Sequence, residues 1–183
     1  MARGLIAVAL VCAIGGGSDF AAADDASSGK PAVAERPEQG CEAFAWPIAR
    51  EQAWFNDAHL ARRDPGARLS RIDRAVEFAL APMSKARFFM PPERPVSAEG
   101  YGGEAVFLGV PRPAVYQVTV SEDVSIDLFE NGARLKPISS TDAPGCAGVR
   151  RSVRYRLAPG DLVLIELSGA QKASIKLAFA EAP

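Results

Sequence analysis

Residues 149–168 decide the fold of this chain, and they read VRRSVRYRLAPGDLVLIELS. Up to Leu157 the side chains alternate in character, and a period of two is typical of a strand with one dry and one wet face. The side chains on the first parity are Arg151, Val153, Tyr155 and Leu157. The alternation predicts a strand whose other parity, which carries three arginines, meets water.

The second part of this stretch is apolar on both parities. Between Leu162 and Leu167 only Glu166 is polar, which indicates a central strand covered on both sides. Pro159 has no N–H to donate and Gly160 accepts a positive φ, so both residues suit a tight turn. We therefore predict that the two strands form a β-hairpin.

Further strands are predicted around this hairpin. Each is a short run rich in apolar residues and bounded by glycine, proline or polar turn residues. The predicted runs are 76–80, 105–110, 115–120, 124–130 and 172–179. About eight strands at roughly ten-residue spacing predict a mainly β fold, an antiparallel β-sandwich or jelly roll.

Residues 131–132, Asn-Gly, are the strongest turn signal in the chain, because a type I′ turn needs positive φ at both positions. A two-residue turn there places Leu128 opposite Leu135, an apolar pair. On the other face it places Asp127 opposite Lys136, a pair of opposite charge. Such pairs on both faces indicate that this register is the correct one.

Proline and glycine also mark the irregular segments. Pro137 lacks the N–H that a ladder needs, which indicates an edge strand or its end. The segment 62–66 is predicted as a turn and 139–148 as a loop.

A short helix is predicted before the strands. Pro47 suits the first helical position, and 48–60 contains good helix formers. Trp46 and Trp54 lie in or beside this segment. They are interpreted either as a platform for a ligand or as side chains that pin the helix onto the sheet.

The N-terminus has the pattern of a secretory signal peptide. Arg3 supplies a positive start, 5–14 is an apolar run too short to span a bilayer, and 21–23 is a small-x-small cleavage site. Lipidation at Cys12 is the alternative, although Val beside the cysteine makes a poor processing site.

Cleavage after residue 23 divides the chain into three parts. Residues 1–23 are then the signal peptide, and Asp24 begins the mature protein. Residues 24–40 are rich in Ala, Ser, Gly, Pro and charge, which predicts a flexible linker. Residues 41–183 are predicted to form a single β-sandwich domain with an N-terminal helical segment. The predicted location is periplasmic or secreted.

Two cysteines remain after cleavage, Cys41 and Cys146. An even number in an oxidising compartment predicts one disulfide between them. Two free buried thiols are the alternative. A metal site is disfavoured, because neither cysteine has a close Cys or His partner in the sequence.

Composition excludes some partners and permits a core. The chain has 183 residues, 48% of them hydrophobic, and a net charge of −1. The hydrophobic content is sufficient for a packed domain, and the charge does not indicate nucleic acid as a partner. We expect a monomer with no membrane span after cleavage.

Three stretches, 114–120, 126–132 and 157–164, carry a resemblance to a known family. On these stretches, residues from about 103 to the end resemble the bacterial pre-peptidase C-terminal type domain, a small secreted β-sandwich. Through 146–150, the mature chain also resembles periplasmic proteins of proteobacteria that have a Cys-Gly-Val-Arg-type segment. The first resemblance implies a binding or stabilising module of the kind that usually accompanies an enzyme domain.

Several kinds of catalytic site are disfavoured by the sequence. A cupin-like metal dioxygenase needs at least two His and a carboxylate, and the chain has only His59. No Gly-x-Ser-x-Gly elbow is present for a serine nucleophile, and no glycine-rich phosphate loop lies between a strand and a helix. We predict no cofactor, no metal and no catalytic residue.

The remaining candidate for a site is an arginine face on the strand of 149–157. Arg150, Arg154 and Arg156 share one parity, and a guanidinium group suits carboxylate, sulfate or phosphate. Asp127 is expected as a neighbour on an adjacent strand. The alternative is a solvated strand face with cross-strand ion pairs.

These observations favour a non-enzymatic periplasmic or secreted β-sandwich that binds an anionic ligand, a glycan or an envelope protein. An enzyme that acts on envelope sugar through an unrecognised site is one alternative, and a purely structural envelope protein is another. An enzyme predicts a polar cleft with shifted carboxyl pKa values, whereas a binding protein predicts an exposed aromatic or arginine patch.

Overall fold

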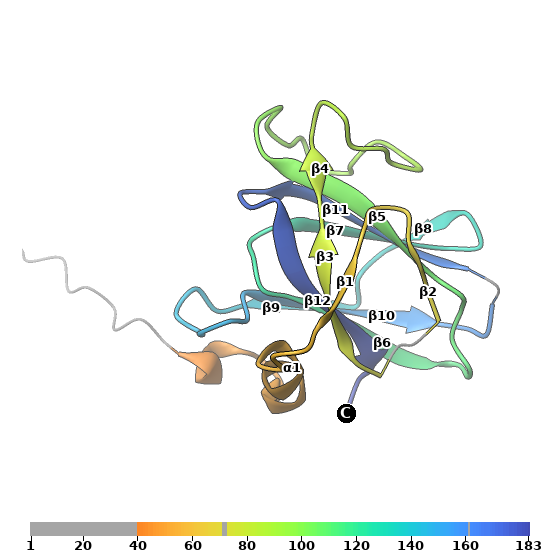
Figure 1. The fold of residues 1–183 in the computed structure, drawn as a ribbon. Helices are drawn as coiled ribbons and strands as arrows, with labels where there is room; N and C mark the ends of the chain where they lie inside the picture. The colour runs from red at the N-terminus through yellow and green to blue at the C-terminus, as the bar shows by residue number, and fades with distance from the viewer. Residues whose placement is uncertain (1–39, 71–72, 161) are drawn as a thin grey trace, which may run out of the picture. The chain divides into compact units, whose positions relative to one another are not determined.

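The computed structural model describes residues 40–70, 73–160 and 162–183, which form a mainly β fold. Two six-stranded sheets pack against each other with a shared hydrophobic core, which confirms the predicted β-sandwich (Figure 1). The predicted signal peptide and all of the linker except Gly40 lie outside the described residues. No helix within the described ranges is long and apolar enough to cross a bilayer.

Sheet A has the strand order β1-β3-β12-β6-β10-β9. Its strands are β1 (Ala61–Arg63), β3 (Ala75–Ala79), β6 (Ala114–Val120), β9 (Ser139–Asp142), β10 (Arg151–Leu157) and β12 (Ser174–Glu181). Sheet B has the order β2-β5-β11-β7-β8, with β4 also paired to β5. Its strands are β2 (Arg68–Leu69), β4 (Ala81–Pro82), β5 (Tyr101–Phe107), β7 (Ser125–Glu130), β8 (Ala133–Leu135) and β11 (Val163–Ala170).

Most strand pairs are antiparallel, as predicted, but β1 with β3 and β2 with β5 are parallel. The core between the sheets is built from alternate residues of facing strands. The inward side chains of β6, β10 and β12 were assigned correctly from their period of two. They are Tyr116, Val118 and Val120, then Val153, Tyr155 and Leu157, then Ile175, Leu177 and Phe179, all buried.

The predicted hairpin of residues 149–168 is wrong, because its two strands belong to different sheets. β10 pairs with β6 and β9 in sheet A, whereas β11 pairs with β5 and β7 in sheet B. The chain after Leu157 therefore crosses from one sheet to the other. The prediction that the second strand is central is confirmed, since β11 lies between β5 and β7.

The turn at residues 131–132 is confirmed, with φ of 49° at Asn131 and 81° at Gly132. Leu128 lies opposite Leu135, as predicted, and β8 is the edge strand of sheet B. The Asp127–Lys136 pair does not form, because the β7–β8 ladder ends at Leu135 and Lys136 is exposed.

The segment before the strands is less helical than predicted. Helix α1 spans Ala49–Phe55, with Ile48 at the N-cap, so Pro47 lies outside it. The helix ends early because Asp57 starts a turn in which its side chain accepts the N–H of His59 at 2.8 Å.

Two predicted irregular segments also contain strand. Residues 61–63 form β1 on β3, which takes up the first two residues of the predicted turn. In the predicted loop 139–148, β9 pairs with β10 and satisfies backbone groups that would otherwise be unpaired at that edge.

β5 begins at Tyr101, four residues before its predicted start. The strand includes Gly102, where a Cβ atom would lie 2.8 Å from the carbonyl oxygen of Leu167 and 2.8 Å from the ring of Phe88. Glycine is needed here because the segment between β4 and β5 packs closely onto the strand.

The outer face of sheet A is covered by residues 40–60. A disulfide joins Cys41 to Cys146, across 105 positions of sequence, which confirms the predicted bond. A second apolar cluster forms beneath this segment. It contains Phe44, Ile48 and Phe55 from the segment, Ala75 of β3, Ala178 of β12, and Ala143, Cys146 and Val149 from the connection before β10.

The outer face of sheet B is covered by residues 83–99, which we call the strap. Phe89 of the strap meets the ring of Phe129 edge-on, with centroids 5.5 Å apart. Arg134 of β8 lies over the same ring at 5.0 Å and donates a hydrogen bond to the carbonyl oxygen of Pro91. Phe129 is fully buried as a result, although it points away from the main core.

Candidate ligand-binding cleft

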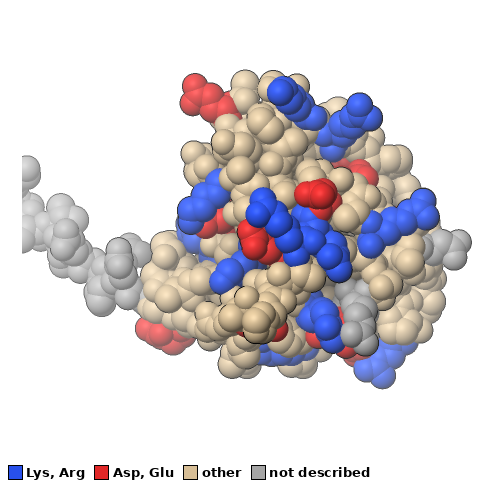
Figure 2. Space-filling model, viewed as in Figure 1, with Lys and Arg blue, Asp and Glu red and all other residues tan. Residues whose placement is uncertain are grey.

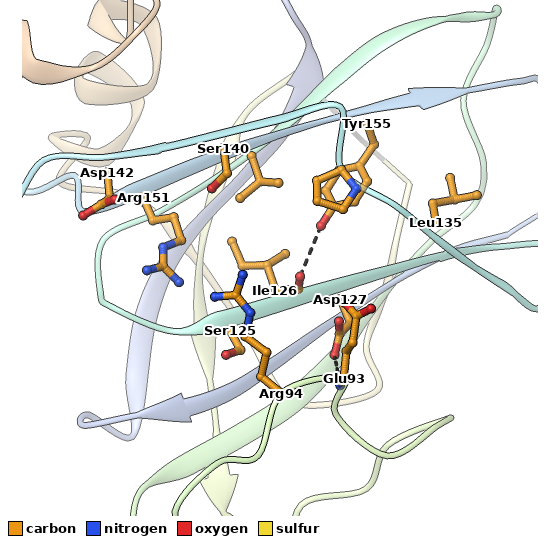
Figure 3. Close-up of a pocket in the computed structure, with 12 residues that line it drawn as sticks. Glu93, Arg94, Ser125, Ile126, Asp127, Leu135, Ser140, Asp142, Arg151 and Tyr155 are labelled. Atoms are coloured by element: carbon orange, nitrogen blue, oxygen red, sulfur yellow. Dashed lines mark hydrogen bonds between the residues drawn. The ribbon is translucent and has the colours of Figure 1, made fainter.

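A cleft of about 280 Å³ opens between the two sheets, where β7 and β8 face β9 and β10 (Figure 3). The strap forms one wall, since Glu93 and Arg94 line the cleft. The other lining residues are Ser125, Ile126, Asp127, Leu135, Pro137, Ser140, Asp142, Arg151, Val153 and Tyr155. The cleft is therefore assembled from both sheets and the strap.

Two arginines reach into the cleft from different elements. Arg94 extends from the strap and Arg151 from β10, and both guanidinium groups point into the same space (Figure 3). Arg151 is oriented by a hydrogen bond to the carbonyl oxygen of Val124 at 2.8 Å and by an ion pair with Asp123 at 2.9 Å. Within the described ranges Arg94 makes no ion pair.

Two of the three carboxylates that line the cleft have partners of their own. Asp142 pairs with Arg150 at 3.2 Å. Asp127 accepts the backbone N–H of Glu93 at 3.1 Å and lies 4.0 Å from Arg134. These contacts partly offset the charges of Asp127 and Asp142, whereas the ion pairs of the described residues include neither Glu93 nor Arg94. The guanidinium of Arg94 is therefore available to an anion.

Tyr155 is buried at the back of the cleft. Its hydroxyl donates a hydrogen bond to the carbonyl oxygen of Ile126 at 3.2 Å. Burial raises the pKa of Tyr155, and the charges of Asp127 and Glu93 raise it further. The phenol therefore stays neutral and serves as a fixed wall rather than as an acid or base.

The predicted arginine face is divided among three environments. Arg150 pairs with Asp123 at 3.3 Å and with Asp142 at 3.2 Å. Arg154 lies 4.2 Å from the centre of the Trp46 ring, and burial lowers its pKa. Arg156 is exposed.

The sequence predicts that Asp127 lies beside this arginine face on an adjacent strand, and this prediction is wrong. The strands adjacent to β10 are β6 and β9, whereas Asp127 lies on β7 of sheet B. The parity of Asp127 turns it away from the main core, toward the strap.

The two tryptophans lie against the protein. Nε1 of Trp46 donates a hydrogen bond to the hydroxyl of Ser152 at 3.1 Å, and its ring stacks on Arg154. The guanidinium of Arg50 lies 5.0 Å above Trp54. These contacts favour the packing interpretation over a ligand platform.

Replacing Arg154 by Ala is expected to destabilise the fold, whereas Arg156→Ala is not. Arg154 loses its stacking on Trp46 and its 3.0 Å hydrogen bond to buried Gln117. These losses predict a decrease of about 1–2 kcal/mol in the free energy of unfolding. The exposed Arg156 should change it by less than about 0.5 kcal/mol. Urea denaturation measures both, and equal midpoints for the two variants would contradict this assignment.

The cleft contains residues that the sequence prediction missed. Arg151 shares its parity with Val153 and Tyr155, so it had to point between the sheets. The period of two in this strand could therefore have identified Arg151 as a residue between the sheets. Arg94 gave none, because no local pattern shows that the proline-rich 91–95 stretch folds over β7.

The cleft presents two guanidinium groups to the space between its walls. None of the residues that line it is a histidine or cysteine. Figure 2 shows acidic side chains among the basic ones on the face in view, so the charges on that face are mixed. His59 lies in a different hollow, with Trp54 and Asp57.

No family model, curated protein or solved structure matches this chain.

Proposed function

We propose that the protein is an exported, non-enzymatic binding module that holds an anionic ligand in the cleft between its sheets. The observation that carries this proposal is the convergence of Arg94 and Arg151, from two separate elements, on one cavity. A guanidinium group forms planar, paired hydrogen bonds with carboxylate, sulfate or phosphate. The Cys41–Cys146 disulfide supports an oxidising compartment.

An acidic glycan fits this cleft better than a free inorganic ion. Two arginines supply the charge recognition, and the hydroxyls of Ser125 and Ser140 add hydrogen-bonding groups. Ile126, Leu135 and Val153 provide an apolar wall for a sugar ring. The proposal agrees with the resemblance to pre-peptidase C-terminal type domains, which are themselves accessory modules.

A catalytic role has less support. Among the residues that the structure describes, the carboxyls with raised pKa values are Glu104 and Glu166, and neither lines the cleft. An acid–base pair therefore does not face the space that a ligand would occupy.

The test is binding of a sulfated and a carboxylated polysaccharide, heparin and polygalacturonate, to the wild type and to Arg94→Ala and Arg151→Ala. Each charge-assisted contact contributes about 1.5–3 kcal/mol, so each variant should bind about 10-fold to 100-fold more weakly. Calorimetry at low ionic strength is the sensitive condition.

Arg156→Ala is the matched control, because it removes an exposed arginine outside the cleft. It should bind as the wild type does. If all three variants lose affinity equally, binding is a general charge effect and the cleft is not the site. Comparison of the two polysaccharides shows which acidic group is preferred.

A further inference from the structure

Three carboxylates form a row across sheet B, outside the main core. In the strand register Glu166 of β11 lies opposite Glu104 of β5 on one side and opposite Asp127 of β7 on the other. Directly opposed residues in an antiparallel pair have their Cβ atoms about 4.5–5.5 Å apart, and like charges there are destabilising. The neighbours of these residues on each strand point into the core, so all three side chains face the strap.

The strap is attached to this row through its backbone. The N–H groups of Phe89 and Met90 both donate to Oε1 of Glu166, the latter at 3.2 Å. The N–H of Glu93 donates to Asp127. The side chain of Glu166 is the centre of the attachment, because it receives two of these three bonds.

The hydrogen-bonding capacity of the Glu166 carboxylate is nevertheless not fully used. The residue is 2% exposed, and within the described ranges its Oε2 atom has no hydrogen-bond partner. A buried carboxylate oxygen without a partner is costly, and a second carboxylate beside it increases the cost. A proton on one of the two glutamates removes both penalties. No group of His, Cys, Asp and Glu in the described part of the chain is arranged to hold a metal that could take its place.

We propose that Glu166 and Glu104 share one proton while the strap is seated, and that loss of this proton loosens the strap. Protonation leaves one carboxylate to accept the N–H groups of Phe89 and Met90. Full ionisation places two negative charges side by side in a covered site. The row therefore acts as a pH-sensitive latch.

The pKa values agree with this geometry. Burial raises the pKa of Glu166, the N–H groups of Met90 and Phe89 oppose the shift, and the charges of Glu104 and Asp127 add to it. Burial also raises the pKa of Glu104, opposed by a hydrogen bond from Phe89. A released strap would return both groups to water and to ordinary pKa values, so the seated state binds more protons. The stabilisation is complete below the ordinary value and is lost as pH rises through the raised one.

Other charges around the latch modulate it without replacing it. Asp127 opposes ionisation of Glu166, and Arg134 of β8 lies beside Asp127. The charged residues on the strap itself are Lys85, Arg87, Glu93, Arg94 and Glu99.

This latch would regulate the cleft, and that part of the inference rests on the proposed function. Glu93 and Arg94, which line the cleft, lie three and four residues after Met90, the second of the two latched residues. Loosening the strap moves Arg94, one of the two arginines, out of the cleft. Ligand affinity should therefore be higher in mild acid than in mild base.

The test is amide hydrogen exchange of Phe89 and Met90 in the full-length protein without ligand. In the wild type their protection factors should fall as the pH rises from about 5 to about 8, because the seated state binds more protons than the released one. Glu166→Gln keeps an acceptor oxygen but cannot ionise, so its protection should not depend on pH. Amides of β6 report global unfolding and should show no such change.

Glu104→Gln is a second test variant that leaves Glu166 in place. It should weaken the pH dependence of the protection factors of Phe89 and Met90. Glu99→Gln is the control, because it removes an exposed charge from the strap and should behave as the wild type does. Equal wild-type protection at both pH values would overturn the latch, as would a pH dependence that persists in both latch variants. Because no ligand is present, failure here is distinct from failure of polysaccharide binding.

Discussion

The Cys41→Ser, Cys146→Ser double variant is expected to lose roughly 4–5 kcal/mol of unfolding free energy in the chain-entropy description of disulfides. The bond closes a loop across 105 positions, so its loss greatly increases the freedom of the unfolded chain. For a domain of this size the melting temperature should fall on the order of 10–20 °C. Differential scanning calorimetry gives the value directly.

In the double variant, the loss of stability should be visible first in residues 40–60. Helix α1 has seven residues and is too short to persist in water without tertiary contacts. Its attachment depends on Phe44, Ile48 and Phe55 in the second apolar cluster and on the disulfide. Limited proteolysis of the variant should therefore cut near Trp46 and Trp54 before it cuts the strands.

Reduction of the wild type supplies the control. A reductant should lower the wild-type melting temperature to that of the double variant and leave the variant unchanged. A variant that melts within about 2 °C of the oxidised wild type would show that the bond contributes little to stability.

Phe129→Ala is expected to cost about 3–5 kcal/mol, the usual range for a buried phenylalanine. Its side chain is fully buried although it lies outside the main core, between Phe89 and Arg134. Truncation leaves a cavity beneath the strap and removes the aromatic and cation contacts together.

Phe89→Ala is the matched comparison, because it removes the other ring of the same pair. Phe89 is 52% exposed, so its truncation should cost only about 1 kcal/mol. Urea denaturation of both variants measures the difference. If the two variants are equally stable, the strap does not bury Phe129 in solution.

Local sequence patterns predicted individual strands better than their partners. The alternation in β6, β10 and β12 identified their inward side chains, and Asn131-Gly132 determined the register of β7 with β8. The Pro159-Gly160 signal correctly marks a change of direction. It does not distinguish a return within one sheet from a crossing to the other, because both need the same turn residues.

The sequence also could not predict what covers the outer faces of the sheets. Ser152 lies on the parity expected to meet water, yet it is fully buried. It is covered by Trp46, which lies 106 residues earlier in the chain. Glu166 appears as a lone polar residue in an apolar strand, and its role depends on Glu104 and on a strap that only the fold brings together.

The disulfide also decides how the domain responds to mechanical load. Because Cys41 and Cys146 are joined, the chain between them is a closed ring that contains β1 to β9. A force applied at the two ends passes from Gly40 through the sulfur atoms to Ala147, and it never stretches those nine strands. Only β10, β11 and β12 lie in the line of force, and each of them is held between two neighbouring strands. Under tension the oxidised domain can therefore extend only over residues 147–183, whereas reduction would allow the whole domain to be drawn out.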